Sequence, residues 1–212
     1  MTTIVVDAPL ARVSARHVIV HGLSVSDRGH HLLPEASFEF FGSGIHVVNT
    51  PSTRASAALA HAIAGTRPVS SGRIQIDGRA LDFGDRRAML GAGVAVLGAD
   101  VGLLPARSVA ANIFLGREHA VHEEMEVDAA AILESLGADI HPLTAVSGVD
   151  RVDRLIVELA RAIAAEAELV VAAEPGPALT RALVRAAERG TRVLLITCTS
   201  TAIDSLEIRG LD

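Results

Sequence analysis

The sequence predicts an α/β fold: a mostly parallel sheet flanked by helices, with a small antiparallel sheet near the N-terminus and a helical subdomain. The main observation is a pair of short apolar runs, residues 169–173 and 192–197, which are typical of strands buried on both faces. A helical pattern over residues 180–189 separates them. Because a strand, a helix and a second strand in this order pair in parallel, these residues predict the core of the sheet.

The first part of the chain carries strand signals that are rich in β-branched and aromatic residues. These signals predict strands over residues 17–25, 36–41 and 45–48. A polar stretch, residues 26–31, separates the first two, and glycines turn the chain into the third. The alanine-rich residues 55–64 predict a helix that ends at Gly65, because glycine is favoured just past a helix end.

The middle of the chain adds further strand and helix signals. Strands are predicted for residues 73–77 and 93–97, and helices for residues 85–90, 128–136 and 152–165. We expect a single domain over residues 1–212. Within it, residues 101–155 would form the helical subdomain and residues 1–16 a lead-in segment.

Composition excludes several classes of function. Of the 212 residues 50% are hydrophobic, yet no run of about 20 apolar residues predicts a membrane span. The net charge of −6 argues against binding to nucleic acid. All 19 Lys+Arg residues are arginine, which excludes chemistry that needs a lysine. Cys198 is the only cysteine and the N-terminus lacks the basic region of a secretory signal, so we expect a cytoplasmic protein without internal disulfides.

Four segments together resemble a known family. They are residues 71–79, 93–118, 157–163 and 169–175. In this order they are similar to framework segments of the ATP-binding cassette, the nucleotide-binding domain of ABC transporters, and most closely to the sugar-importer type. The resemblance implies the P-loop NTPase-like fold of ABC ATPases, with ATP hydrolysis as the family's activity and ATP and Mg²⁺ as its cofactors.

The loop that binds phosphates in this family is replaced here. In the family a glycine-rich loop ending in Gly-Lys-Ser/Thr follows the third strand, where N–H groups and lysine hold the phosphates and the hydroxyl binds Mg²⁺. Residues 49–57, here named the phosphate-loop segment, contain no glycine. Ser56 stands at the position of the lysine and Ala57 at that of the Mg²⁺ ligand. Pro51 removes one N–H donor.

Other positions depart from the family in the same way. The glutamine that senses Mg²⁺ corresponds to Ala99, and the metal-binding aspartate to Ala173. The switch histidine corresponds to Cys198 and the adenine-stacking aromatic to Asp27. The Leu-Ser-Gly-Gly-Gln signature corresponds to residues 149–153, whose carboxylates would repel a triphosphate.

One family position is retained. Glu174, followed by Pro175, corresponds to the general base that polarises the attacking water. Glu174 is therefore the candidate catalytic residue. General-base help contributes about 10² to 10⁴ in rate, and only where the phosphates are already positioned. The alternative is that Glu174 is an inherited residue at the end of a buried strand.

Four residues of the phosphate-loop segment are candidates for contact with phosphate: Ser52, Thr53, Arg54 and Ser56. They would lie at a helix N-terminus, where anions are stabilised. The alternative is that they form an ordinary helix cap.

Three further features of the sequence have structural as well as functional explanations. Residues 103–105 and 113–115 are apolar and fall where the family contacts the membrane subunit, but they could equally form the subdomain core. Residues 119–124 hold two histidines and two glutamates in a polar connector without a further ligand pair, so we predict no metal site. The thiol of Cys198 is expected to be buried and inert.

These observations favour a degenerate ATP-binding subunit, a pseudo-ATPase kept as a scaffold or regulatory partner of a sugar-type importer. No nucleotide cofactor is predicted, since ATP and Mg²⁺ are implied by the resemblance alone. The expected partner is a second copy or a competent ABC ATPase, together with membrane subunits at the inner face of the membrane. Two alternatives stay open: a cassette that binds or slowly hydrolyses ATP through a rebuilt phosphate site, and a free-standing homodimeric interaction protein. In the family further strands follow residue 203, so the resemblance implies a trimmed sheet edge here, and the surface it leaves to be covered favours an oligomer.

Overall fold

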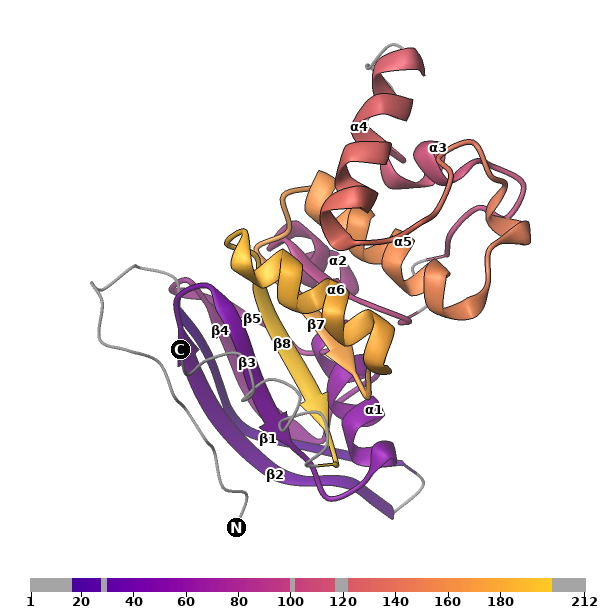
Figure 1. Ribbon diagram of the computed structural model, residues 1–212. Coiled ribbons are helices and arrows are strands. Elements are labelled where there is room, and N and C mark those ends of the chain that lie inside the picture. The colour runs from indigo at the N-terminus through magenta and orange to yellow at the C-terminus, as the bar shows by residue number, and fades with distance from the viewer. Residues whose placement is uncertain (1–16, 28–29, 100–101, 117–121, 200–212) are drawn as a thin grey trace, which may run out of the picture.

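The computed structural model describes residues 17–27, 30–99, 102–116 and 122–199. It contains two four-stranded sheets, with strand orders β2-β1-β4-β5 and β3-β8-β7-β6, and helices gathered beside the second sheet (Figure 1). This arrangement confirms the predicted α/β fold with a small antiparallel sheet. The predicted lead-in, residues 1–16, lies outside the described residues.

The antiparallel sheet is built from β1 (His17–Asp27), β2 (His30–Phe41), β4 (Ser71–Ile76) and β5 (Arg79–Leu81). The prediction that residues 26–31 separate two strands is wrong, because Ser26 pairs with His31 and both strands continue towards the turn. The hydroxyl of Ser26 and Nδ1 of His31 lie 3.2 Å apart, so cross-strand pairing satisfies these polar side chains. β5 was not predicted, because three residues are too few to show a period.

The parallel sheet is built from β3 (Gly44–Asn49), β6 (Val94–Val96), β7 (Leu169–Ala173) and β8 (Arg192–Thr197). The bounds of β7 and β8 coincide with the predicted ones, and the two strands pair in parallel as expected. Every residue of β8 is buried. Both faces of the sheet are covered, which explains why these strands are apolar at nearly every position.

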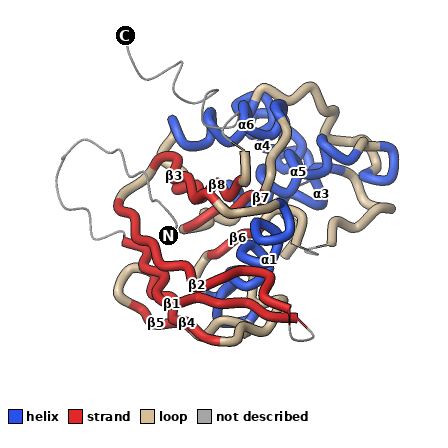
Figure 2. Tube along the Cα trace, turned by 90° about the horizontal axis from the view of Figure 1, so that it is seen from below, coloured by secondary structure: helices blue, strands red, loops and turns tan. Residues whose placement is uncertain are grey.

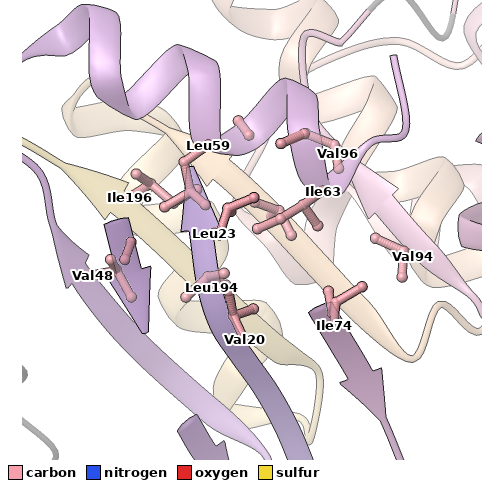
Figure 3. Close-up of a cluster of buried hydrophobic side chains, with 14 of the residues drawn as sticks. Val20, Leu23, Val48, Leu59, Ile63, Ile74, Val94, Val96, Leu194 and Ile196 are labelled. Atoms are coloured by element: carbon pink, nitrogen blue, oxygen red, sulfur yellow. The ribbon is translucent and has the colours of Figure 1, made fainter. Parts of the chain in front are cut away.

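Helix α1 (Thr53–Ile63) lies between the two sheets. Its Leu59 and Ile63 are fully buried in one apolar cluster with Leu23 of β1 and Leu194 of β8 (Figure 3). The chain leaves the helix through Gly65, which has φ +68° and whose added Cβ would lie 2.5 Å from the backbone nitrogen of Arg86. Glycine is therefore required where α1 turns away, as the sequence predicts.

The other face of the parallel sheet carries most of the remaining helices (Figure 2). They are α3 (Val109–Ile113), α4 (His122–Leu136), α5 (Arg151–Ala164) and α6 (Pro177–Glu188), with α2 (Arg86–Gly91) before β6 and a 3₁₀ turn, η1 (Val146–Gly148), before α5. Helix α6 starts three residues before the predicted start, since proline is favoured in the first helical turn. The bounds of the helical subdomain stay a prediction. Within the part of the chain described, none of the helices combines the length and the apolar character needed to cross a membrane.

Candidate functional site

The candidate site lies at the carboxyl edge of the parallel sheet, where β3, β7 and β8 end (Figure 1). The phosphate-loop segment leaves β3, Glu174 follows β7, and Cys198 follows β8. The backbone N–H of Thr50 donates to the carbonyl of Thr197 at 2.9 Å, which joins the loop to β8. Parallel strands deliver their carboxyl ends to one edge, so residues far apart in the sequence meet there.

The start of α1 is a helix cap with three solvent-facing residues. Ser52 is extended, with φ −165° and ψ 159°, and its hydroxyl accepts the N–H of Ala55 at 3.2 Å. Ser52, Thr53 and Arg54 are exposed. A cavity of about 10 Å³ beside Thr50 and Pro51 has room for no more than one water molecule. Three of the four candidate phosphate residues thus form the cap and its exposed first turn, and their contact with phosphate stays a prediction.

Ser56, the fourth candidate, points inward and is 0% exposed. Its hydroxyl lies 2.5 Å from Oε1 of Glu174 and 2.7 Å from the hydroxyl of Thr50. Since a carboxylate only accepts, Ser56 donates its proton to Glu174 and accepts from Thr50. The residue at the position of the family's lysine is therefore a buried hydroxyl bonded to the residue at the position of its general base.

The carboxylate of Glu174 has two further donors. The backbone N–H of Cys198 donates to Oε1 at 2.7 Å, and the hydroxyl of Thr197 lies 3.3 Å from Oε2. We refer to Thr50, Ser56, Glu174, Thr197 and Cys198 as the Glu174 network. The sequence places Thr50 in the phosphate-loop segment without assigning it a contact, and it does not single out Thr197, because an isolated threonine at a strand end carries no pattern that separates it from ordinary strand residues.

Cys198 is half-buried, so the expectation of a buried thiol is wrong. Desolvation, followed by the hydrogen bond to Glu174 and its negative charge, raises the pKa of the Cys198 thiol above its ordinary value. Hydrogen bonds from the backbone of Cys198 itself and of Thr53 act in the opposite direction on this pKa. Because the thiolate is the reactive form, a raised pKa favours an unreactive thiol. Its inertness stays a prediction.

The segment at the signature position, residues 149–153, caps its own helix. The carboxylate of Asp150 accepts the N–H of Asp153 at 2.8 Å at the start of α5. Burial and the neighbouring charge of Asp150 raise the pKa of Asp153. Nε of Arg154 donates to the carbonyl of Val149 at 2.8 Å. The positive end of this helix is therefore already occupied by a carboxylate of the same chain.

The remaining motif positions are apolar or lie outside the described residues. Ala99 is 2% exposed, and Ala173 packs at the edge of the core between the sheets. The N–H of Gly98 donates to Oε2 of Glu158 at 2.7 Å, which ties the segment before Ala99 to α5. The side chain of Asp27 and residues 117–121 are not described. Among the described residues no group of three or more His, Cys, Asp or Glu could hold a metal ion.

A groove lies along the edge strand β6, between α2 and α5. It has a volume of about 230 Å³, and Leu90, Leu115, Glu158 and Arg161 are among its lining residues. Leu115 is 36% exposed. The predicted apolar segments divide between the two alternatives, since Ile113 is 2% exposed and belongs to the core whereas Leu115 lines this groove.

These features define the class of the protein. A helix follows β3 between two sheets, the strand ends gather at one edge, and a helical region packs on the opposite face, which is the architecture of an ATP-binding cassette. The chain belongs to the ABC transporter family, whose model matches residues 57–176 of this sequence. The match begins after most of the phosphate-loop segment.

Curated relatives and solved structures are similar to this chain. A putative ribose/galactose/methyl galactoside import ATP-binding protein of Burkholderia ambifaria is 27% identical over 81% of this chain and 35% of its own length. The arabinose import ATP-binding protein AraG of Chromohalobacter salexigens is 30% identical over 83% of this chain and 38% of its own length. The chain thus spans little more than a third of these relatives.

Two solved cassettes share the fold. A nucleotide-free ATP-binding cassette from an ABC transporter has a TM-score of 0.68 and 13% identity over 90% of this chain and 84% of its own. The cbiO1 protein of Clostridium perfringens, part of the ABC transporter complex cbiONQ, has a TM-score of 0.65 and 16% identity over 85% of this chain and 77% of its own.

Proposed function

We propose that this chain is a degenerate ATP-binding subunit that does not hydrolyse ATP and acts as a scaffold or regulatory partner in a sugar-type importer. The observation that carries the proposal is the contact of Ser56 with Glu174, because the position of the phosphate-binding lysine holds a buried hydroxyl that donates to a carboxylate. Mg²⁺-ATP needs cationic groups and free N–H donors around its phosphates. The chain has no lysine, and the phosphate-loop segment has no glycine, so these residues do not fit Mg²⁺-ATP and no hydrolytic step is assigned to Glu174.

A second observation supports the proposal at the signature position. In a cassette dimer this segment would face the partner's nucleotide, as the family resemblance implies. Here the carboxylate of Asp150 accepts the N–H of Asp153 in the first turn of α5, and Asp153 adds a second carboxylate. A triphosphate brought to this helix would meet like charges, which at about 4 Å costs about 1 kcal/mol in water and more where water is excluded.

The scaffold role is supported by the groove beside β6. It combines an apolar floor with Glu158 and Arg161, a composition suited to a helix or loop of another protein. The relatives named above are import ATP-binding proteins for sugars, which favours a sugar-type importer, a cytoplasmic location at the inner face of the membrane, and membrane subunits as partners. The second cassette would be another copy or a competent ABC ATPase.

Thermal unfolding in the presence of Mg²⁺-ATP tests the nucleotide part of the proposal. A ligand at about 100 times its dissociation constant stabilises the folded protein by roughly 2.7 kcal/mol. We expect no shift of the unfolding midpoint at millimolar Mg²⁺-ATP and no phosphate release. A shift that disappears in Arg54→Ala would favour the alternative, a rebuilt phosphate site at the exposed first turn of α1.

Co-purification with the membrane subunits of a sugar importer tests the scaffold part. Leu115→Arg places a charge in the groove and should lower the recovered membrane subunit at least tenfold. Leu143→Arg is the matched control, since Leu143 is a 55% exposed leucine that does not line the groove. Equal recovery with both variants would refute docking at the groove. A chain that forms a stable homodimer and recovers no membrane subunit would instead support the free-standing interaction protein.

A further inference from the structure

The carboxylate of Glu174 lies where hydroxyl and N–H donors from separate elements converge. Ser56 donates from the first turn of α1, the N–H of Cys198 donates from the residue after β8, and Thr197 approaches from the end of β8. Proteins bind phosphate and carboxylate anions with such a convergence of hydroxyl and N–H donors. In this chain the oxyanion comes from the protein itself.

We propose that Glu174 is an internal ligand of the phosphate site, and that its carboxylate takes the donors an incoming phosphate would need. This proposal rests on the proposed function and adds the means by which nucleotide is excluded. The side chain that corresponds to the family's general base thereby acts as a built-in competitor of phosphate.

The distribution of hydrogens supports this role. A hydroxyl has one proton, and Ser56 directs its proton at Glu174 over 2.5 Å. The hydroxyl of Thr50 has acceptors of its own, since it lies 2.7 Å from the hydroxyl of Ser56 and 3.2 Å from the carbonyl oxygen of Ser52. The N–H of Cys198 is used by the same carboxylate. A phosphate that approached the network would therefore meet lone pairs and a negative charge in place of donors.

The backbone of Glu174 holds the side chain in this direction. Glu174 has φ +47°, a left-handed conformation that is uncommon for residues other than glycine. Its N–H donates to the carbonyl of Ile196 at 2.8 Å, which anchors the turn to β8. The turn and the side chain are thus bound to the same strand, so the carboxylate is positioned before any ligand arrives.

Binding of inorganic pyrophosphate to the full chain tests the proposal. Glu174→Ala and Glu174→Gln remove the charge, and Glu166→Ala is the control, because Glu166 is an exposed glutamate that also has a left-handed backbone, with φ +53°. We expect pyrophosphate to raise the unfolding midpoint of Glu174→Ala by about 3 to 5 °C at roughly ten times the dissociation constant, and that of Glu174→Gln by less, because the glutamine oxygen can still accept from Ser56 and Cys198. The unchanged protein and Glu166→Ala should show no rise. Pyrophosphate binding by the unchanged protein, or no gain in folded Glu174 variants, would overturn the proposal.

The amide signal of Cys198 in the unchanged ¹⁵N-labelled protein gives a second test that needs no variant. If Glu174 keeps the N–H of Cys198, this signal stays in place when pyrophosphate is added at about 10 mM, whereas displacement of the carboxylate would move it. A moving, saturable signal would overturn the proposal. The two proposals fail separately, because Mg²⁺-ATP binding by the unchanged protein refutes the proposed function, whereas pyrophosphate-insensitive Glu174 variants refute only the internal ligand.

Discussion

The two ends of the parallel sheet each hold a charged side chain, and they satisfy it in opposite ways. At the carboxyl edge, the carboxylate of Glu174 is bound by neutral hydroxyl and N–H donors. At the amino edge, Nη2 of Arg192 donates to both oxygens of Asp77 at 3.2 Å. The side chain of Arg192 is 0% exposed and that of Asp77 is 29% exposed.

The difference shows how the sheet tolerates buried charge. Several separate donors share the anion, so losing one of them leaves the others in place. The cation depends on a single carboxylate, and Nε and Nη1 of Arg192 make no hydrogen bond within the described residues. A buried cation without its partner is expensive, because little else nearby replaces the water that it has lost. We therefore expect the amino edge to be the more fragile of the two.

The largest loss of stability should come from Asp77→Asn, because this substitution leaves the guanidinium of Arg192 buried without a counter-charge. Asparagine tolerates the left-handed backbone of this position, φ +49°, so the loss reports on charge. We expect a loss of about 3 kcal/mol in the free energy of unfolding, measured by urea denaturation. The double variant Asp77→Asn with Arg192→Met should recover most of it. Equal stability of the single and double variants would show that the ion pair is not what holds this edge.

Ser56→Ala should have a smaller effect at the carboxyl edge. It removes one donor from a charged acceptor, which costs about 2 kcal/mol, while the N–H of Cys198 still binds the carboxylate. Thr53→Ala is the control, because Thr53 is exposed on the same helical turn. Urea denaturation measures the free energy of unfolding of both variants. If Ser56→Ala lowers the free energy of unfolding more than Asp77→Asn does, the carboxyl edge is the more fragile of the two edges.

A pH titration sharpens the comparison at the amino edge. Burial, and to a lesser extent the charge of Arg192, lowers the pKa of His46 below 6.5, while the carbonyl of Gly42 acts in the opposite direction. The ring stacks on Phe40 at 4.4 Å. Because the unfolded chain binds this proton first, stability is fully present above about pH 6.5 and falls as the pH decreases towards the folded pKa, by at most about 1.4 kcal/mol per pH unit.

Denaturation of the unchanged protein and of His46→Leu between about pH 7 and 5 measures this slope. The variant should lose the part of the slope that belongs to His46. Identical slopes in the two proteins would contradict the assignment.

The smallest effect concerns the thiol of Cys198. Desolvation and then Glu174 raise its pKa, so Glu174→Gln should shift the pH profile of alkylation by iodoacetamide to lower pH and increase the rate at pH 8 about threefold. Glu166→Ala should leave the profile unchanged. If the pH profile of alkylation is the same in the unchanged protein and in Glu174→Gln, burial alone raises the pKa of the Cys198 thiol.

Much of the fold was predictable because its signals are local. β7 and β8 are short and apolar, so their bounds follow from hydropathy, and the helix between them predicts their parallel pairing. The N-terminal hairpin was harder to predict, since Ser26 and His31 are polar residues that become strand only by pairing with each other. Within the site, Glu174, Ser56 and the segment that contains Thr50 could be located from the sequence, whereas the contact of Thr50 with Ser56 and the role of Thr197 could not.

The sequence by itself determined that the chain has no lysine and that residues 49–57 have no glycine, because those are properties of composition and of local sequence that no fold can change. Only the tertiary structure decided which groups meet. Ser56 and Glu174 are 118 positions apart, and Arg192 and Asp77 are 115 positions apart. Contacts at such separations depend on how the sheets and helices pack, and no local pattern in the chain specifies them.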